Sequence, residues 1–461
     1  MCSPRVRACR SIPLSWSSFA KCCPQTLLDK TVAECTLGCK VNRCDTDALL
    51  EALTGRGYTV TDFNKPADIY LINTCTVTHI ADRKSRQMIR RARKLNPGAR
   101  VAVCGCLSNI SKEAVREAGA DFAFNSRDVA SLLAWLSGSD GRDAGGASPG
   151  FDAAGVGDEP EASAGPAAGR VRAYIKIQEG CDRYCAYCIV PYARGRVVSR
   201  AFGEVLAVAE NLVARGYKEI VLTGIHAASY GKDSGKPLPE LMAAVAKVNG
   251  LRRLRLSSIE PCAAEENFLR AVAENPKICG HFHLSLQSGC DATLKRMNRR
   301  YTAREYAEAA ARLREVRNNA ALTTDVIVGF PGEMDADFEE SLRFVERVGF
   351  ARAHVFEYSP RAGTPAAGFE NQIPPEVKNE RGERMRRLTA NLERGFLRQN
   401  IGSTAEVLFE TNKSGFWEGH TENYIKVRAE DTGLNLWNEL VTVRLKSADE
   451  KGAFITGKVL Y

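Results

Sequence analysis

The sequence predicts an α/β protein with three successive domains: a small parallel α/β domain, a partial (β/α)6 barrel and a small C-terminal β-barrel. Short apolar runs alternate with amphipathic stretches over 31–137 and again over 171–400, which predicts the first two domains. Over 401–461, short β-prone segments lie between polar turns, which predicts the third. The chain has 461 residues, 44% of them hydrophobic, so it can form several cores.

The first residues of the chain contain little that could fold. Residues 1–28 carry four basic residues, several serines and no acid. This composition is typical of a transit peptide, and a disordered extension has the same composition. We expect a disordered extension over 1–30, and the sequence leaves open whether it acts as a targeting peptide.

The first domain is expected over 31–137. Repeated alternation of strand and helix predicts a small parallel sheet covered by helices. The expected strands are "TVAECTLG", "DIYLINTCTV" and "ARVAVCGC", and the expected helices are "DTDALLEALTGRG", "SRQMIRRARKL" and "KEAVREAG". Residues 138–170 then consist almost wholly of Gly, Ala, Ser, Pro and acids, which predicts a flexible linker.

The second domain is expected over 171–400. Its strands are "AYIKIQ", "EIVLTG", "RLRLSS", "HFHLSL", "TTDVIVGF" and "RAHVFEYS", with helices such as 203–215, 303–316 and 334–348 between them. Six such units predict a partial barrel, in which chemistry belongs to the loops after the C-terminal ends of the strands. A charged helix near 376–400 precedes the small β-barrel of 401–461.

Three cysteines follow the first barrel strand in a C-x3-C-x2-C array: Cys181, Cys185 and Cys188. A disulfide framework fits poorly, because three is odd and the chain is long. Structural zinc needs a fourth ligand, and no histidine lies within 35 residues of the array. Three thiolates suit a 4Fe-4S cluster that keeps one iron open, and zinc stays the alternative.

Composition indicates which kind of partner the protein binds and in which compartment it acts. The net charge of +9 is compatible with a polyanion such as RNA. The chain has 16 cysteines but no apolar run of 18 residues and no clean signal peptide, which favours a reducing compartment. We therefore expect a cytoplasmic protein without a membrane segment.

Four collinear blocks resemble a known family. They are "TLGCKVNRCDTD", "IQEGCDRYCAYCIVPYARG", "LSLQSGCDATLKRMNRRYT" and "TTDVIVGFPGE". The array and its barrel resemble the radical S-adenosylmethionine (SAM) enzymes, and the flanking residues resemble the methylthiotransferases among them. The forms "GCKVN" and "IVLTGIHAASYG" resemble the branch that acts on N(6)-threonylcarbamoyladenosine beside the tRNA anticodon. The resemblance covers nearly all of the chain from residue 31.

The resemblance implies a second 4Fe-4S cluster in the first domain, held by Cys39, Cys75 and Cys106. All three follow predicted strands of one parallel sheet, so they can meet at one edge. Cys104 is an alternative to Cys106, and the family pattern favours Cys106. Cys35 and Cys44 are expected to be structural.

The resemblance also implies an activity: transfer of a methylthio group to C2 of N(6)-threonylcarbamoyladenosine at position 37 of tRNA. SAM bound at the first cluster would give the radical, and the auxiliary cluster would give the sulfur. The alternatives are a ribosomal-protein aspartate or an isopentenyl-adenosine as substrate, and a non-catalytic metal-bearing RNA-binding protein. The exact nucleoside, the sulfur source and the reductant stay open. We expect a monomer and an electron donor such as flavodoxin or ferredoxin.

The resemblance and a shared place at strand ends indicate a set of residues that could line the SAM or nucleoside pocket. They could instead only satisfy one another. The set is Tyr187, Thr223, Gly224, Ser258, Glu260, Gln287 and Asp325. The histidines His226, His283 and His354 are expected to be ordinary polar fillers.

Contact with tRNA would need positive surface. The stretch 82–94 holds seven Lys or Arg against one Asp, and a second basic set is Arg296, Arg299 and Arg300. The last domain resembles the RNA-binding TRAM module, but 401–461 holds seven basic against nine acidic residues. Any RNA contact there should use a local face, for which we expect Trp417, His420, Tyr424, Lys426 and Arg428.

Overall fold

A computed structural model describes residues 30–138, 170–449 and 452–460. The predicted extension over 1–30 and the predicted linker over 138–170 lie almost wholly outside the described residues. Among the described residues, no helix is long and apolar enough to cross a membrane.

The N-terminal domain has a parallel sheet, as predicted, and this sheet has five strands in the order β2-β1-β3-β4-β5. The strands are β1 (Thr31–Thr36), β2 (Thr59–Thr61), β3 (Ile69–Thr74), β4 (Arg100–Gly105) and β5 (Phe122–Ala123). The helices are α1 (Lys40–Thr54), α2 (His79–Leu95), α3 (Cys106–Ile110), α4 (Lys112–Glu117) and α5 (Val129–Leu136). Helices α1 and α5 pack on one face, and α2 and α4 on the other. The central strand β3 is therefore buried on both faces.

The central domain is a partial barrel of six parallel strands: β6 (Arg172–Glu179), β8 (Glu219–Gly224), β9 (Arg253–Leu256), β10 (His281–His283), β11 (Ala321–Val328) and β12 (Arg352–Glu357). The ladders β6-β8-β9 and β10-β11-β12 are joined by isolated bridges such as Leu254↔Ile278. A short antiparallel strand β7 (Val198–Ser199) flanks β6. No ladder joins β6 to β12 among the described strands, so the wall is open between them, as a partial barrel requires.

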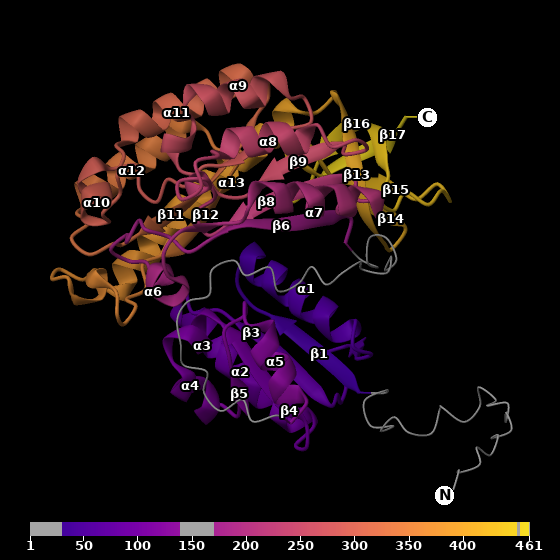
Figure 1. Cartoon of the computed structure of the whole chain (residues 1–461). Coiled ribbons are helices and arrows are strands. Elements are labelled where there is room, and N and C mark those ends of the chain that lie inside the picture. Colours follow the sequence, from indigo (N-terminus) through magenta and orange to yellow (C-terminus); the bar gives the residue numbers. More distant parts are fainter. Residues whose placement is uncertain (1–29, 139–169, 450–451, 461) are drawn as a thin grey trace, which may run out of the picture.

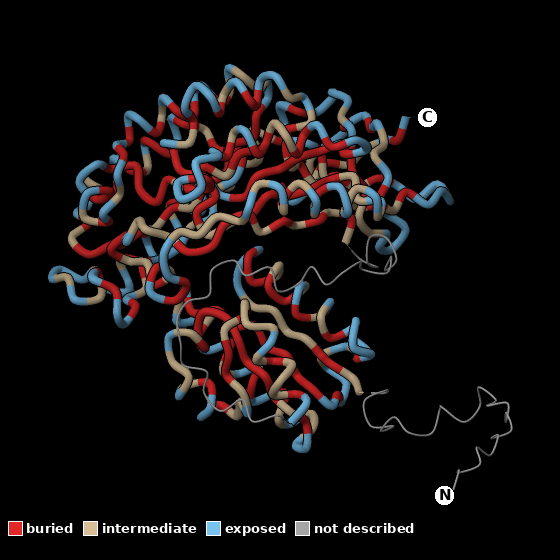
Figure 2. Tube along the Cα trace, viewed as in Figure 1, coloured by how far each residue is buried: buried red, intermediate tan, exposed pale blue. Residues whose placement is uncertain are grey.

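Helices cover the outer side of this wall: α7 (Phe202–Ala214), α8 (Leu238–Ala246), α9 (Glu266–Glu274), α10 (Asp291–Arg296), α11 (Ala303–Val316), α12 (Asp335–Val348) and α13 (Pro375–Gln399). The short helix α6 (Val190–Arg194) instead packs against α3 of the N-terminal domain (Figure 1). Alternate strand residues such as Ile175, Leu222 and Phe282 join the apolar core with the outer helices. Their neighbours Lys176, Thr223 and His283 therefore face the inner side. Figure 2 shows the same division, with buried strands and exposed outer helix faces.

The C-terminal domain is a closed barrel in the order β13-β14-β15-β17-β16. Its strands are β13 (Thr404–Lys413), β14 (Phe416–Thr421), β15 (Lys426–Glu430), β16 (Leu440–Ala448) and β17 (Ile455–Val459). Strand β14 contains Glu418, Gly419 and His420, which are weak strand formers. The tertiary structure needs the glycine, since a β-carbon at Gly419 would lie 2.8 Å from the Phe409 Cα.

This small barrel caps the N-terminal ends of the central strands, opposite the cysteine array. Arg253 at the start of β9 donates to the carbonyl of Glu406 (2.6 Å), and Arg255 donates to that of Glu422 (2.8 Å). The Tyr424 ring stacks between two histidine rings, His281 at 4.7 Å and His420 at 4.8 Å.

The predicted RNA-binding face of this barrel is therefore wrong in its central members. His420 and Tyr424 face the central domain, and Trp417 is buried in the core of the small barrel. Lys426 and Arg428 are only partly buried, but both pair with Glu418. Aromatic spacing suggested a stacking surface, whereas burial of these rings against the central domain and core is the stronger driving force.

Candidate active site

The cysteine array lies in the loop that follows β6. Cys185 is buried, and Cys181 and Cys188 are half-buried. The loop returns close to its own start: the Cys181 amide donates to the Gly195 carbonyl at 3.0 Å. Gly180 makes this return possible, because its φ is +69° and a β-carbon there would lie 1.8 Å from the Arg196 carbonyl oxygen. The three thiols are thus held at the C-terminal edge of the barrel strands.

A buried arginine contacts the array. Arg299 Nη1 donates to Cys185 Sγ at 3.3 Å, and Arg299 Nη2 lies 3.0 Å from Glu260 Oε1. The Arg299 guanidinium therefore places a permanent positive charge beside the sulfur of Cys185. Burial of the thiol raises the pKa of Cys188 to about 12, so ligation there has to displace a proton.

The second basic set therefore does not form a surface patch as predicted. The Arg299 side chain is only 6% exposed, and Arg296 is paired with Asp337 at 2.6 Å. Of the three, Arg300 is exposed. Spacing along the chain could not show this, because adjacent residues in a loop point in different directions.

Glu260 joins the strand ends around the array. Its carboxylate lies 2.7 Å from Arg183 and 3.1 Å from His226 Nε2, in addition to Arg299. Burial opposes ionisation of this carboxyl, but these three neighbours outweigh it and lower the pKa of Glu260 to about 2. Glu260 is therefore a carboxylate that holds two arginines and a histidine in place.

Cys39, Cys75 and Cys106 follow the neighbouring strands β1, β3 and β4, all at one edge of the N-terminal sheet. The turn before Cys39 touches Cys75, since a β-carbon at Gly38 would lie 3.0 Å from Cys75 Sγ. Cys104 differs: it lies within β4, packs in the core with α1 and α5, and burial raises its pKa far above the usual range.

The two sets of cysteines suit iron-sulfur clusters because of the kind of ligand they offer. In the part of the chain that the structure describes, no three His, Cys, Asp or Glu side chains lie close enough to hold a single metal ion. A 4Fe-4S cluster instead binds each thiolate through a separate iron, so its ligands stand farther apart. Three cysteines beside a cationic arginine at each site fit such a cluster in chemistry and in charge.

Arg194 connects the two cysteine sites. It is the last residue of the short helix α6, which begins just after Cys188. Its Nε donates to Cys106 Sγ at 3.4 Å, and its Nη1 donates to Asp45 (3.0 Å) and Glu179 (2.9 Å). One guanidinium thus bridges a thiol of the N-terminal domain to the strand that leads into the array.

The charges around Arg194 form a buried network between the domains. Lys176 pairs with both Asp45 and Glu179, and Ser126 donates to Asp45 at 2.9 Å. Burial disfavours the Asp45 carboxylate, but Lys176 and Arg194 lower its pKa overall. Sequence reasoning missed this network, because its members lie far apart in the chain. The one feature of the sequence that could have indicated this network is that its charged residues lie next to the cysteine motifs.

Comparison with known proteins agrees with this arrangement. Residues 175–345 match the radical SAM superfamily, and residues 31–125 match the uncharacterized protein family UPF0004. The threonylcarbamoyladenosine tRNA methylthiotransferase MtaB of Bacillus subtilis is 39% identical, over 91% of this chain and 94% of that protein. The chain belongs to the radical SAM methylthiotransferase family.

Other comparisons place this methylthiotransferase among its relatives. The tRNA-2-methylthio-N(6)-dimethylallyladenosine synthase of Aquifex aeolicus is 35% identical, over 84% of this chain and 89% of that protein. The radical SAM methyltransferase TsrM of Kitasatospora setae has a TM-score of 0.52 at 17% identity, over 74% of this chain and 77% of that one, and it shares the fold. The methylthiotransferase is a transferase that uses SAM and 4Fe-4S clusters, as predicted.

The predicted pocket residues of the methylthiotransferase lie at the strand ends, with different degrees of exposure. Thr223 is buried, and Ser258 is exposed. Gly224 lies against Gln178, since a β-carbon there would be 2.9 Å from Gln178 Oε1. Ser257, which we did not predict, is buried and its Oγ has no partner among the described residues.

Of the remaining pocket residues, Gln287 follows β10, Asp325 lies within β11, and Tyr187 lies in the array loop. Gln287 has a left-handed φ of +71° and bridges to β11. Asp325 lies 3.3 Å from His283, so His283, like His226, has a carboxylate neighbour. The half-buried Tyr187 packs edge-on against Phe330 at 6.4 Å.

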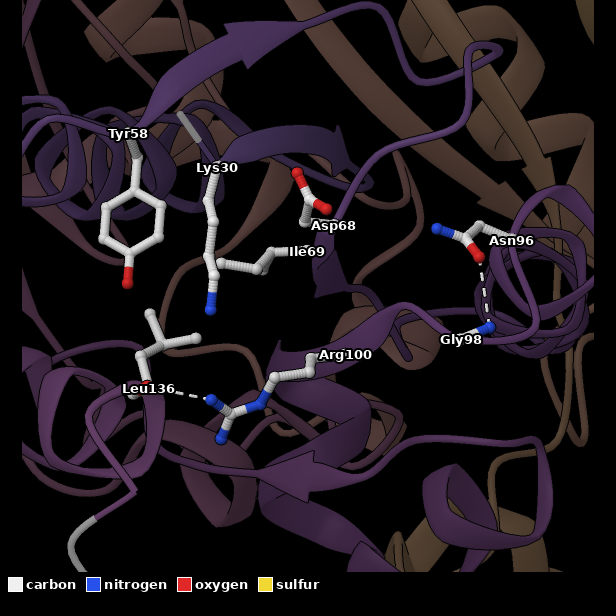
Figure 3. Close-up of a pocket in the computed structure, with 8 residues that line it drawn as sticks. All are labelled: Lys30, Tyr58, Asp68, Ile69, Asn96, Gly98, Arg100 and Leu136. Atoms are coloured by element: carbon white, nitrogen blue, oxygen red, sulfur yellow. Dashed lines mark hydrogen bonds between the residues drawn. The ribbon is translucent and has the colours of Figure 1, made fainter. Parts of the chain in front are cut away.

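A surface pocket in the N-terminal domain lies away from these groups. Figure 3 shows Lys30, Tyr58, Asp68 and Arg100 around a space of about 180 Å³. These residues lie at or near the N-terminal ends of β1, β3 and β4, whereas the cysteines follow the C-terminal ends. Arg100 is held by the Leu136 carbonyl at 2.8 Å. The pocket is therefore not part of the active site.

Proposed function

We propose that this methylthiotransferase transfers a methylthio group to C2 of N(6)-threonylcarbamoyladenosine at position 37 of tRNA. The relatives from Bacillus subtilis and Chlamydia pneumoniae, 39% and 37% identical, support this substrate by their names. The observation that carries the reaction type is the bridge through Arg194, which joins Cys106 of one set of three cysteines to Glu179 on the strand that leads into the other set. A reaction that needs both a radical and a sulfur donor requires two such sites near each other.

In this proposal Cys181, Cys185 and Cys188 hold the cluster that binds SAM, and Cys39, Cys75 and Cys106 hold the auxiliary cluster. When bound, SAM and the two clusters supply a carbon-centred radical and the sulfur atom. The chain itself positions these groups. Arg299 and Arg194 donate to one thiol of each set, and Glu260 fixes Arg299.

The pocket for SAM and the nucleoside is proposed from the strand ends. Buried polar groups without a partner are costly, and the Ser257 hydroxyl is such a group. A bound ligand would satisfy it. We assign this role to Ser257 together with the predicted set Tyr187, Thr223, Gly224, Ser258, Glu260, Gln287 and Asp325.

Lys40 supports the threonylcarbamoyl substrate over a dimethylallyl one. Lys40 follows Cys39, is exposed, and makes no ion pair with any described residue. Its electrostatic neighbours Arg172 and Arg255 are both paired, Arg172 with Glu410 and Arg255 with Glu219, each at 2.8 Å. A threonylcarbamoyl group carries a carboxylate that suits the ammonium of Lys40, whereas a dimethylallyl group is apolar.

The partners follow from the proposed substrate. The tRNA anticodon loop would approach the exposed basic residues of α2, among them Arg83, Lys84 and Arg90. An electron donor such as flavodoxin or ferredoxin would reduce the clusters. We propose a monomer that acts in the cytoplasm, where tRNA is modified.

The test is an assay of the anaerobically reconstituted protein with tRNA, followed by mass spectrometry of the nucleosides. We expect about eight irons per chain, since each of two clusters holds four, and a methylthio product only from tRNA that carries threonylcarbamoyladenosine. A triple Cys39, Cys75 and Cys106 to Ala variant should keep about half of the iron, whereas Cys35→Ala should keep all of it. A product on dimethylallyl-adenosine, or on a ribosomal protein instead of tRNA, would refute the proposed substrate.

A further inference from the structure

The loop that carries the cysteine array also presents aromatic rings to solvent. Tyr184 is 43% exposed and Tyr192 is 49% exposed. Their ring centroids lie 5.7 Å apart in an edge-to-face arrangement. Large aromatic side chains gain free energy from burial, so two neighbouring exposed rings beside an active site suggest a surface that a partner covers.

The backbone holds one of these rings in place under strain. Tyr184 has φ +48°, a left-handed conformation that a bulky residue rarely adopts. Asn298 fixes it by donating its amide to the Tyr184 carbonyl at 2.9 Å. A glycine would relieve this strain, so the presence of a tyrosine is better explained by what its side chain contacts.

A pocket of about 180 Å³ begins at the residues just before Tyr184. It is lined by Asp182, Arg183, Ser229, Lys232, Asp233 and Arg300 among others. All come from loops at the C-terminal ends of the barrel strands. The pocket is therefore at the same edge of the barrel as the cysteine array.

The charges of this pocket favour an anion. Asp233 accepts from the Ser199 amide at 2.7 Å, and Asp182 lies 3.7 Å from Arg196. In contrast, neither Lys232 nor Arg300 makes an ion pair with any residue that the structure describes. Two uncommitted cations in a pocket of this size suit one phosphodiester group.

We propose that Tyr184, Tyr192 and this pocket form a docking site for a single-stranded RNA loop, in which a base stacks on the tyrosines and a backbone phosphate contacts Lys232 and Arg300. Cations interleaved with exposed aromatic rings are the combination that single-stranded nucleic acid requires, since each nucleotide offers one phosphate and one π-face. An acidic peptide would bind the two cations, but it would leave the two tyrosine rings exposed.

The site deepens the proposed function, on which it rests. Arg183 and Tyr184 lie between Cys181 and Cys185, and Arg300 follows Arg299, which donates to Cys185. The loop that holds the thiols would therefore also hold the RNA. A nucleotide docked here fixes the position of its neighbours relative to the array, which a reaction at one chosen base requires.

The experiment measures binding of two fluorescent RNAs to the reconstituted protein: a hairpin with an unpaired loop and a blunt duplex of equal length. Tyr192→Ala should weaken hairpin binding roughly tenfold, because stacking on an aromatic ring is lost, and should leave duplex binding unchanged. Arg300→Ala should weaken binding of the hairpin and lower the salt slope by about 0.7, as expected for one lost phosphate contact on a single strand. The matched control is Arg304→Ala, which removes an exposed arginine of α11 that is paired with Glu308.

Iron content and thermal melting check that each variant is folded. Equal affinity of Tyr192→Ala, Arg300→Ala and Arg304→Ala for the hairpin would overturn the docking site. That result can be told apart from a failure of the proposed function, in which the unmodified protein binds the hairpin but gives no methylthio product on any tRNA. Equal weakening of hairpin and duplex by Tyr192→Ala would also overturn the stacking role.

Discussion

Two buried arginines define the chemistry at the scale of single residues. Arg194 and Arg299 each donate to a cysteine sulfur, and each is neutralised by buried carboxylates. A buried charge is costly unless it is paired. Loss of the carboxylates would therefore leave each guanidinium buried without a partner. Neither arginine was singled out from the sequence for such a role, since a guanidinium is usually exposed.

Lys40 gives a prediction at the same scale. Lys40→Gln removes a cation that has no ion-pair partner among the described residues and stands beside Cys39. If it binds the substrate carboxylate, conversion of threonylcarbamoyladenosine in tRNA should fall at least tenfold, since a charge-assisted hydrogen bond contributes about 1.5–3 kcal/mol. Mass spectrometry of the nucleosides measures this. Lys65→Gln, an exposed lysine of the same domain, is the control, and equal conversion by both variants would contradict the role.

At the scale of elements, the short helix α6 fixes the distance between the two cysteine sites. It starts at Val190 and ends at Arg194, and Asn109 of α3 donates to the Ala193 carbonyl at 3.0 Å. This contact and the Arg194 network hold α3 against α6 (Figure 1). A five-residue helix has little stability of its own, so packing of the N-terminal domain stabilises it.

Arg194→Met should therefore loosen the junction between the domains. The change leaves Asp45 and Glu179 buried with Lys176 as their remaining charged partner, which costs about 3–5 kcal/mol. Urea denaturation measures the free energy of unfolding. Arg196→Met changes an arginine two residues away whose side chain is 86% exposed, and should cost less than about 0.5 kcal/mol. Equal stability of the two variants would show that the network does not stabilise the junction.

At the scale of the whole molecule, the C-terminal domain covers one end of the central barrel, and the cysteine array lies at the other end. The C-terminal domain covers the N-terminal ends of the strands through Arg172, Arg253 and Arg255. Glu219 neutralises Arg255 and Arg253 there. The N-terminal domain lies against the inner side of β6, where Asp45 accepts from Lys176 (Figure 1). It also contacts α6 at the C-terminal end of the barrel strands, where Arg194 donates to Cys106.

This cap predicts a dependence of stability on pH. Burial opposes ionisation of Glu219, but Arg255, Arg172 and Arg253 lower its pKa to about 2, from 4.5 in the unfolded chain. Because the pKa is lower in the folded state, ionised Glu219 adds about 3 kcal/mol to the free energy of unfolding above pH 4.5. This contribution is lost as the pH falls from 4.5 toward 2.

Urea denaturation of the metal-free protein and of Glu219→Gln should therefore differ by about 3 kcal/mol near neutral pH. The difference should shrink steadily below pH 4.5, because protonated glutamic acid and glutamine are both neutral. Glu266→Gln, whose side chain is 88% exposed, serves as the control and should show no such trend. A difference that stays constant with pH would contradict the assigned charge state.

Much of the fold and part of the site followed from local pattern. The alternation of apolar runs and helices gave the parallel sheet, the partial barrel and the small β-barrel, because periodicity records which side of each element is buried. The array after β6 was predicted from its spacing, whereas Cys39, Cys75 and Cys106 were singled out by the family resemblance and by their place after strands of one parallel sheet. The amino-acid sequence by itself thus determined the main strands and helices of each domain and pointed to the two sets of cysteines.

The tertiary structure alone decided which charges meet. Arg194 lies 149 residues from Asp45 and Arg299 lies 114 residues from Cys185, and their contacts depend on how the domains and loops pack. It also decided that His420 and Tyr424 face the central domain rather than solvent. The physical reason is that hydrophobic periodicity is a property of neighbours in the chain, whereas pairing of buried charges is a property of neighbours in space.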